Sequence, residues 1–255
     1  MLSDIDVESV VRRIRPNTRR SPLPGHERIH GWGIMAHPFD SGHILALRVA
    51  AQNDFAPYTS VWHRSPDGAW SIYVDGPRLD AACPRYWGAA TEHAQLTDVS
   101  VEWTGPADLV IEVSDPKLRW TASMDAGPVV RAANTLTRRL PESVLRSWPA
   151  VQLTELAADR LFDLGDVTLA TSVPNGQEAT VLTRMLFPIV DGSARLGDED
   201  LGNSATVPET PTFGEARLPA RPVFVVGGAY ATILDAEEYE RTVEELQGGW
   251  TNDTS

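Results

Sequence analysis

Imidazole side chains are concentrated in one stretch of the sequence, where they alternate with large aromatic rings. Five of the six histidines and three of the eight tryptophans lie between residues 26 and 75. They are His26, His30, His37, His43, His63, Trp32, Trp62 and Trp70. Side chains that titrate near neutral pH, placed among flat apolar rings, are typical of a small-molecule pocket. The alternative interpretation is a β-sheet whose core contains the rings and whose strand ends carry the histidines.

The register of one hairpin decides which of these side chains share a face. Residues 65–68 have the sequence SPDG, a strong turn signal because proline sets the first corner and glycine accepts the left-handed one. A four-residue loop would pair His63 with Trp70. A three-residue loop with a glycine bulge would instead group Trp62 with Trp70 on one face and leave His63 and Asp75 on the other. We predict the second register, because it separates apolar from polar side chains more cleanly.

The preferred register suggests a catalytic set. It brings the imidazole of His63, the phenol of Tyr73 and the carboxylate of Asp75 onto one surface, which suits general acid–base chemistry. His63 and Asp75 would then act as acid and base, and His37 or Tyr73 would orient the substrate. The alternative is that His63 and Asp75 merely pair at a solvated surface.

A ligand site is expected beside this set, lined by the N-terminal half of the chain. Its predicted ligand-binding residues are Trp32, Trp62, Trp70, Arg85, Tyr86 and Trp87. The last three belong to a loop that could close one end of the fold, where Arg85 could anchor a carboxylate or carbonyl group. Packing at the surface is the alternative role of that loop. Because adjacent residues of a strand point to opposite faces, only one of Trp62 and His63 should reach the pocket.

Signatures of cofactor and metal chemistry are missing from the sequence. There is no G-x-S-x-G elbow, no G-x-G-x-x-G fingerprint and no Walker loop. His37, His43 and Asp40 lack the spacing of a metal site. The single cysteine, Cys83, has no obvious activating base beside it, which favours a buried structural thiol. We therefore expect neither a metal nor a cofactor.

Composition restricts the partners and the compartment. The chain has 255 residues and a net charge of −13, which opposes binding to nucleic acids and to anionic membrane surfaces. No segment approaches the roughly 20 apolar residues of a membrane-spanning helix, and no signal peptide is recognisable. A lone cysteine fits a reducing compartment. We expect a soluble, cytoplasmic protein whose partner is an apolar small molecule; the sequence does not indicate its oligomeric state.

Strands must position most of these side chains. From residue 31 to residue 124, apolar and polar residues alternate, with a turn about every 8 to 12 residues, as in an antiparallel meander. Residues 3–14 predict a short helix. Residues 128–148 predict a longer one, with an apolar stripe made of Val129, Val130, Ala133, Leu136 and Leu140.

The second half of the chain is also predicted to consist mainly of strands. Strands are predicted at residues 167–172, 179–189, 193–196 and 222–233, with a long loop at 197–221. Asp235 and Glu238 form a capping box for a closing helix. The chain then divides into an N-terminal helix and arm (1–25), a first β-meander or barrel half (26–127), a connecting helix (128–150), a second β half (151–234) and a C-terminal helix and tail (235–255).

Three short motifs in the C-terminal third carry a family resemblance. They are PNG at residues 174–176, DEDLG at 198–202 and LPARPVFVVG at 218–227. With the order of the predicted elements, they resemble the lipocalin-like (calycin) proteins, and within them the two-half group of the hydroxyneurosporene synthase type. The resemblance implies a barrel interior of ligand size, compatible with catalysis or with plain binding. No catalytic residue of that group matches this chain position by position.

These patterns predict a mainly β fold of antiparallel, lipocalin-like barrels with central and terminal helices. The expected function is binding of a mostly apolar small molecule, with cofactor-independent hydration, isomerisation or cyclisation by proton transfer. The alternatives are a non-catalytic carrier or sensor, and a structural or assembly protein with a solid core. A cavity of roughly several hundred Å³ would favour the first two over the third.

Overall fold

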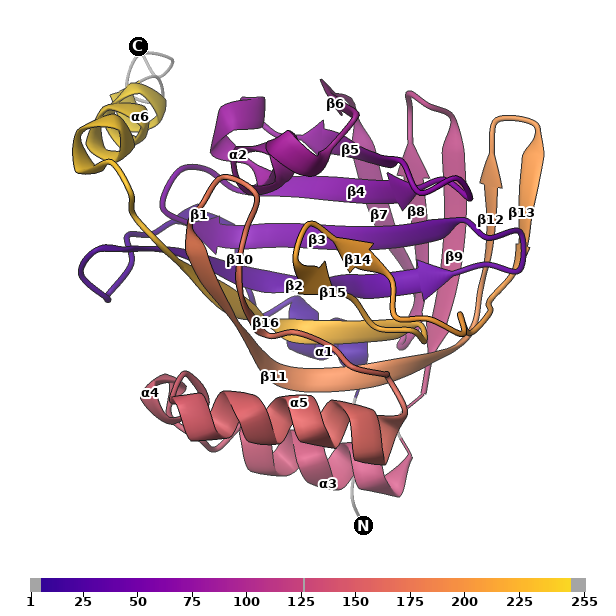
Figure 1. Cartoon of the computed structure of the whole chain (residues 1–255). Helices are drawn as coiled ribbons and strands as arrows, with labels where there is room; N and C mark the ends of the chain where they lie inside the picture. The colour runs from indigo at the N-terminus through magenta and orange to yellow at the C-terminus, as the bar shows by residue number, and fades with distance from the viewer. Residues whose placement is uncertain (1–5, 126, 249–255) are drawn as a thin grey trace.

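The fold is mainly β, as predicted (Figure 1). A computed structural model describes residues 6–125 and 127–248. The described residues form sixteen strands, six α-helices and two short 3-10 helices, and fourteen of the strands belong to one mostly antiparallel sheet. This sheet bends into two layers that pack against each other.

The first layer carries the histidine- and tryptophan-rich stretch. In spatial order its strands are β10 (Ala170–Ser172), β11 (Glu178–Asp191), β16 (Val223–Thr232), β2 (His26–Pro38), β3 (Ile44–Asn53), β4 (Tyr58–Arg64), β5 (Trp70–Asp75) and β6 (His93–Leu96). Strand β6 runs parallel to β5, and the short β1 (Asn17–Thr18) runs parallel to β3. All other pairs in this layer are antiparallel. Neighbours in sequence are therefore mostly neighbours in the sheet, as expected for a meander.

The second layer lies behind the first in Figure 1. Its strands are β7 (Val99–Gly105), β8 (Asp108–Val113), β9 (Leu118–Met124), β12 (Ser193–Leu196) and β13 (Glu199–Asn203). The chain passes between the layers near Gly192, because the end of β11 and residues Ala194 to Leu196 of β12 pair with β9. A Cβ atom at Gly192 would collide with the ring of His37, so glycine is needed at this crossing. Among the described residues, no ladder joins the two ends of the strand path into a closed barrel.

The main core fills the space between the two layers. Alternate residues of β9 point into it, so that Leu118, Trp120, Ala122 and Met124 are buried. Phe187 and Phe224 of the first layer meet them from the other side. We call this side of the first layer the core face.

The opposite side of the first layer is also buried, and we call it the covered face. The two 3-10 helices η1 (Leu79–Ala81) and η2 (Gly88–Ala90), helix α2 (Cys83–Trp87), and the hairpin β14 (Thr212–Phe213) and β15 (Ala216–Arg217) lie over it. Phe213 stacks on Trp70 with ring centroids 4.5 Å apart, and on Trp87 at 4.9 Å. The predicted loop at 197–221 therefore contains β13 and this hairpin, a correction that follows from the rings the hairpin buries.

The SPDG hairpin adopts the predicted register. Ser65 N–H donates to Ala69 O at 3.0 Å, and Gly68 has a φ of 101°, as a three-residue loop with a glycine bulge requires. Trp62 lies opposite Ile72, and His63 lies opposite Ser71. Trp62, Trp70 and Ile72 consequently share the covered face, whereas His63, Tyr73 and Asp75 lie on the core face.

Helices α3 (Pro128–Thr137), α4 (Glu142–Leu145) and α5 (Trp148–Phe162) lie beneath β11 in Figure 1. The helical region thus continues past residue 150, where a β half was expected to begin. The predicted stripe of α3 is also wrong: Val130 is buried, but Val129 and Leu136 are 60% and 63% exposed. The reason is that α3 docks on an open edge of β11 through Asn134, whose side chain bonds both Leu186 N–H and Leu186 C=O at 2.9 Å.

One short helix lies near the start of the sequence, and a longer helix lies near its end. Helix α1 (Val7–Val11) begins at Asp6, whose carboxylate accepts from Ser9 N–H, and residues 3–5 of the predicted helix lie outside the described residues. Helix α6 (Ala236–Gly248) has the predicted cap, because Asp235 accepts from the N–H groups of Glu237 and Glu238. Within the described part of the chain, no helix is both long and apolar enough to cross a membrane.

Candidate functional site

A cavity of about 170 Å³ lies between the covered face and the segments above it. Strands β2, β3, β11 and β16 form its floor, and α2, β15 and residues 168–173 form its walls. Most lining side chains are apolar, among them Ile29, Met35, Val173, Val181, Leu218 and Val225. The cavity therefore draws on both halves of the chain, not on the N-terminal half alone as expected.

Four glycines keep the floor open. Gly31 and Gly33 of β2 and Gly227 and Gly228 of β16 line the cavity without a side chain. A Cβ atom at any of them would collide with the carbonyl oxygen of a residue on the neighbouring strand. Only glycine fits these backbone positions, and the space over β2 and β16 stays free as a consequence.

Aromatic rings form one wall. Trp62 of β4 and Trp87 of α2 lie with their ring centroids 5.4 Å apart, and Phe213 packs edge-on against Trp62 at 5.2 Å. Tyr58 and Tyr86 add two phenol rings to the lining. Flat rings with a few polar groups among them are the usual lining of a small-molecule site.

Arg48 of β3 contributes a positive charge to this mostly apolar lining. Its guanidinium lies over the Trp62 ring, 4.5 Å from the centroid. Nη1 donates to the carbonyls of Ile34 at 2.5 Å and Leu47 at 2.9 Å, and Nη2 donates to Met35 at 3.1 Å. Burial lowers the pKa of Arg48 to about 10, so the side chain remains positively charged at neutral pH.

A hydrogen-bonded chain lies next to this cation. Trp62 Nε1 donates to Ser60 Oγ at 3.2 Å, Ser60 Oγ donates to Cys83 Sγ at 3.3 Å, and Tyr58 Oη lies 3.4 Å from the same sulfur. Burial raises the pKa of Cys83 and raises that of Tyr58 well above its usual range. Both groups are therefore neutral at physiological pH, and Cys83 is the buried thiol that the sequence predicted.

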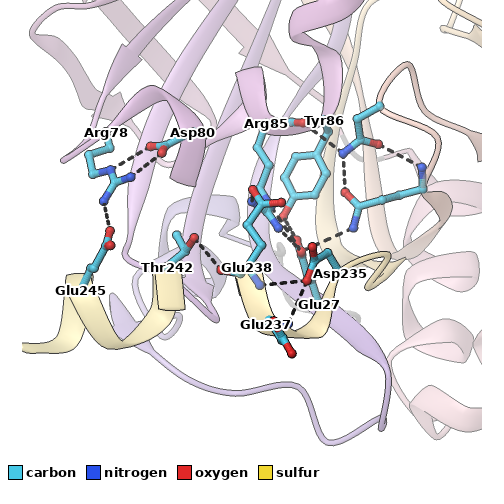
Figure 2. Close-up of polar contacts among 12 residues, drawn as sticks. Glu27, Arg78, Asp80, Arg85, Tyr86, Asp235, Glu237, Glu238, Thr242 and Glu245 are labelled. Atoms are coloured by element: carbon cyan, nitrogen blue, oxygen red, sulfur yellow. Dashed lines mark hydrogen bonds and ion pairs between the residues drawn. The ribbon is translucent and has the colours of Figure 1, made fainter. Parts of the chain in front are cut away.

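Glu27 closes another part of the lining, and its charge is already balanced. Its carboxylate accepts from Arg85 Nη2 at 2.9 Å and from Tyr86 Oη at 2.5 Å (Figure 2). Arg85 also lies 3.8 Å from Glu238 of α6. The guanidinium of Arg85 is thus held by two protein carboxylates.

The predicted ligand-binding residues divide between the cavity and its surroundings. Trp32, Trp62, Tyr86 and Trp87 touch the cavity. The Trp32 ring packs mainly on Trp103 and Phe224, with centroids 6.0 and 5.6 Å away. Trp70 and Arg85 do not line the cavity, because the Trp70 ring is stacked on Phe213 and Arg85 is paired with Glu27.

The structure does not bring His63 and Asp75 together. Asp75 lies opposite Thr59, four residues along the strand from His63, a separation of about 13 Å at the rise of a β-strand. His63 instead stacks on His43, with Nε2 of His63 2.7 Å from Nδ1 of His43, and Asp75 accepts from Val99 N–H. Tyr73 packs in the main core. None of these side chains lines the cavity, so of the neighbours Trp62 and His63 only Trp62 reaches it.

His37 is fixed inside the core by partners on both ring nitrogens. Trp120 Nε1 donates to His37 Nδ1 at 3.0 Å, so the ring proton is on Nε2 and is donated to Ser204 Oγ at 2.6 Å. Burial lowers the pKa of His37 to about 3. A neutral, doubly bonded imidazole outside the cavity supports packing rather than substrate orientation.

Arg48 and the glycines are the site residues that sequence reasoning missed. In the sequence, Arg48 follows the alternation of β3 as an ordinary polar residue facing solvent. In the fold, the apolar cover of α2 and β15 makes it half-buried. One signal in the sequence could have indicated this cover. The covering segments are rich in aromatic rings, and such segments need an apolar sheet face to pack on. Among residues 6–125 and 127–248, no cluster of three or more histidine, cysteine or acidic side chains has the arrangement of a metal site.

Comparison with known proteins identifies no relative. Neither a protein-family model nor a curated protein nor a solved structure matches this chain.

Proposed function

We propose that this protein binds a mostly apolar small molecule in the cavity on the covered face, as a carrier or sensor. The observation that supports the proposal is the cavity itself, with its open glycine floor and its wall of rings. Its 170 Å³ is smaller than the space expected from the sequence. An apolar cavity of about 150 Å³ nevertheless accommodates benzene, so the ligand should be about the size of one ring.

Binding is better supported than catalysis by proton transfer. The expected acid, base and orienting groups, His63, Asp75, His37 and Tyr73, lie outside the cavity. Of the groups that do line it, Glu27 is neutralised by Arg85, and Tyr58 and Cys83 keep their protons. A lipocalin-like origin belongs to the same proposal, and the meander order of β2 to β5 supports it.

Titration with a neutral, ring-sized probe tests the proposal. Nitrobenzene should bind the wild-type protein saturably in ligand-observed NMR or calorimetry. Ala229→Leu, which adds three carbons to the lining of the cavity, should weaken binding at least tenfold. Ala132→Leu, on the exposed side of α3, is the matched control and should bind like the wild type. Absence of saturable binding, or unchanged binding by a folded Ala229→Leu variant, would show that the cavity is not a ligand site.

A further inference from the structure

Arg48 is a half-buried cation, and it has no acidic partner in the described part of the chain. Among the described residues, no carboxylate lies within ion-pair distance of its guanidinium, whereas Arg85, which does not line the cavity, is paired with Glu27 and Glu238. The acidic groups nearest to Arg48, Tyr58 and Cys83, are both neutral. The lining of the cavity therefore carries one uncompensated positive charge.

The hydrogen bonds of Arg48 leave part of its donor capacity unused. A guanidinium has five N–H groups, and three of those of Arg48 are donated to the backbone carbonyls of Ile34, Met35 and Leu47. The N–H of Nε and one N–H of Nη2 have no acceptor among the described residues. Two N–H groups on one guanidinium can be accepted together by the two oxygens of a carboxylate.

The surroundings favour an anion over a neutral polar group. Partial removal of a charge from water is costly unless the charge is paired. The three carbonyls and the Trp62 ring compensate the half-buried cation only through dipoles and the ring quadrupole. An anionic ligand group would remove that cost, while the rest of the ligand would meet apolar side chains such as Ile29, Val181 and Leu218.

The geometry points to a small apolar monocarboxylate as the ligand, with its carboxylate on Arg48 and its ring or short chain against Trp62 and the glycine floor. This inference rests on the proposed function, since it names the chemical class that the cavity takes. The volume limits the apolar part to about one six-membered ring or an aliphatic chain of similar size.

A purely structural role of Arg48 makes a different prediction. The carbonyls of Ile34 and Met35 lie where the pairing of β2 with β3 shifts register, between Ile34 and His37, and Arg48 bonds both. If holding this irregularity were its only role, replacing Arg48 would change stability and affect all ligands alike. The selectivity between a charged and a neutral ligand of the same shape would not change.

The test compares benzoate with nitrobenzene, its neutral isostere, at one pH and one salt concentration. The wild-type protein should bind benzoate at least tenfold more tightly than nitrobenzene. Arg48→Met should abolish that preference while binding nitrobenzene within threefold of the wild type, and Arg48→Lys should retain part of it. Ala229→Leu should weaken both probes together, which places them in the same cavity.

The outcomes separate this inference from the proposed function. If the wild type binds nitrobenzene as tightly as benzoate, the carboxylate inference is overturned and the apolar cavity stands. If neither probe binds, both proposals fall. If Arg48→Met does not fold, Arg48→Lys and Arg48→Gln replace it. Equal affinities of the wild type for benzoate and nitrobenzene would overturn the inference. An undiminished preference for benzoate in both replacement variants would overturn it as well.

Discussion

Buried charged side chains in this protein have very different surroundings. Glu27 has a guanidinium, a phenol and an amide as partners, so its charge is fully hydrogen-bonded. Asp54 is equally buried, at 1% exposed, but only its Oδ2 accepts a hydrogen bond, from Arg28 N–H at 2.9 Å, and Oδ1 has no partner among the described residues. Burial raises the pKa of Asp54 to about 6. This carboxylate is therefore a local cost to the fold at neutral pH.

Asp54→Asn should stabilise the protein at pH 8. Because the folded pKa of Asp54 lies above its unfolded value of 3.8, its favourable contribution is complete below pH 3.8 and is lost as the pH rises through about 6. A shift of this size corresponds to at most about 3 kcal/mol, and we expect a gain of about 1 to 3 kcal/mol in the free energy of unfolding. Urea denaturation at pH 8 and at pH 4 measures it.

The gain should disappear near pH 4, where the wild-type carboxyl is protonated. Asp198→Asn, at an exposed site, is the control and should change the unfolding free energy by less than about 0.5 kcal/mol. A less stable Asp54→Asn variant at pH 8 would contradict the assignment of Asp54 as a destabilising charge.

At the scale of elements, the features that a few adjacent residues determine were predicted from the sequence. The way in which helix α3 packs on the sheet was not. The register of β4 and β5 followed from the turn at 65–68, and the start of α6 followed from Asp235, because a few adjacent residues determine each. The orientation of α3 depends instead on an open edge of β11, far away in sequence. Its carbonyl and N–H groups require polar partners, so Asn134 points inward and Leu136 outward, against the apolar pattern.

Asn134→Ala should destabilise the protein more than Leu136→Ala, although leucine is the larger apolar side chain. Losing Asn134 leaves the buried N–H and C=O of Leu186 without partners, which costs about 1 to 3 kcal/mol for each group that water does not reach. We expect a loss of about 2 to 4 kcal/mol for Asn134→Ala. Leu136 is 63% exposed, and its removal should cost less than about 0.5 kcal/mol. Thermal and urea unfolding of the two variants decide the order, and the reverse order would mean that α3 docks by its apolar stripe.

At the scale of the whole molecule, the site depends on which segments cover the sheet. The sequence indicated the ring-rich strands and the loop at 85–87, and four of the six predicted ligand residues touch the cavity. It could not indicate that β11, β16 and β15 complete the lining. β16 pairs with β2, about two hundred positions away in sequence, and β11 joins the sheet there only through β16. The histidines that suggested catalysis are held by long-range partners such as Trp120 and Ser204. Their position near rings reflects packing in the main core.

His37 and His63, which are buried, and His30, which is half-buried, should control the acid stability of the protein. Burial lowers the pKa of His37 to about 3 and those of His30 and His63 to about 4, whereas an unfolded histidine titrates near 6.5. Because the folded pKa values are depressed, the stabilising contribution is complete above pH 6.5 and is lost as the pH falls toward 4. Each proton taken up only by the unfolded chain steepens the loss by about 1.4 kcal/mol per pH unit. Asp54 acts in the opposite direction below pH 6, so the net loss should reach about 3 kcal/mol per pH unit.

His63→Gln isolates one of these protons. Its unfolding free energy should fall less steeply between pH 6.5 and pH 4.5 than that of the wild type, by about 1.4 kcal/mol per pH unit, because glutamine does not titrate. His93→Gln is the matched control, since His93 is exposed at the edge strand β6, and its slope should equal that of the wild type. Urea titrations at four pH values across this range give the slopes. Equal slopes for the wild type and His63→Gln would mean that His63 takes up its proton in the folded protein. That behaviour is expected of a solvent-facing acid–base group, and not of a ring packed beside His43.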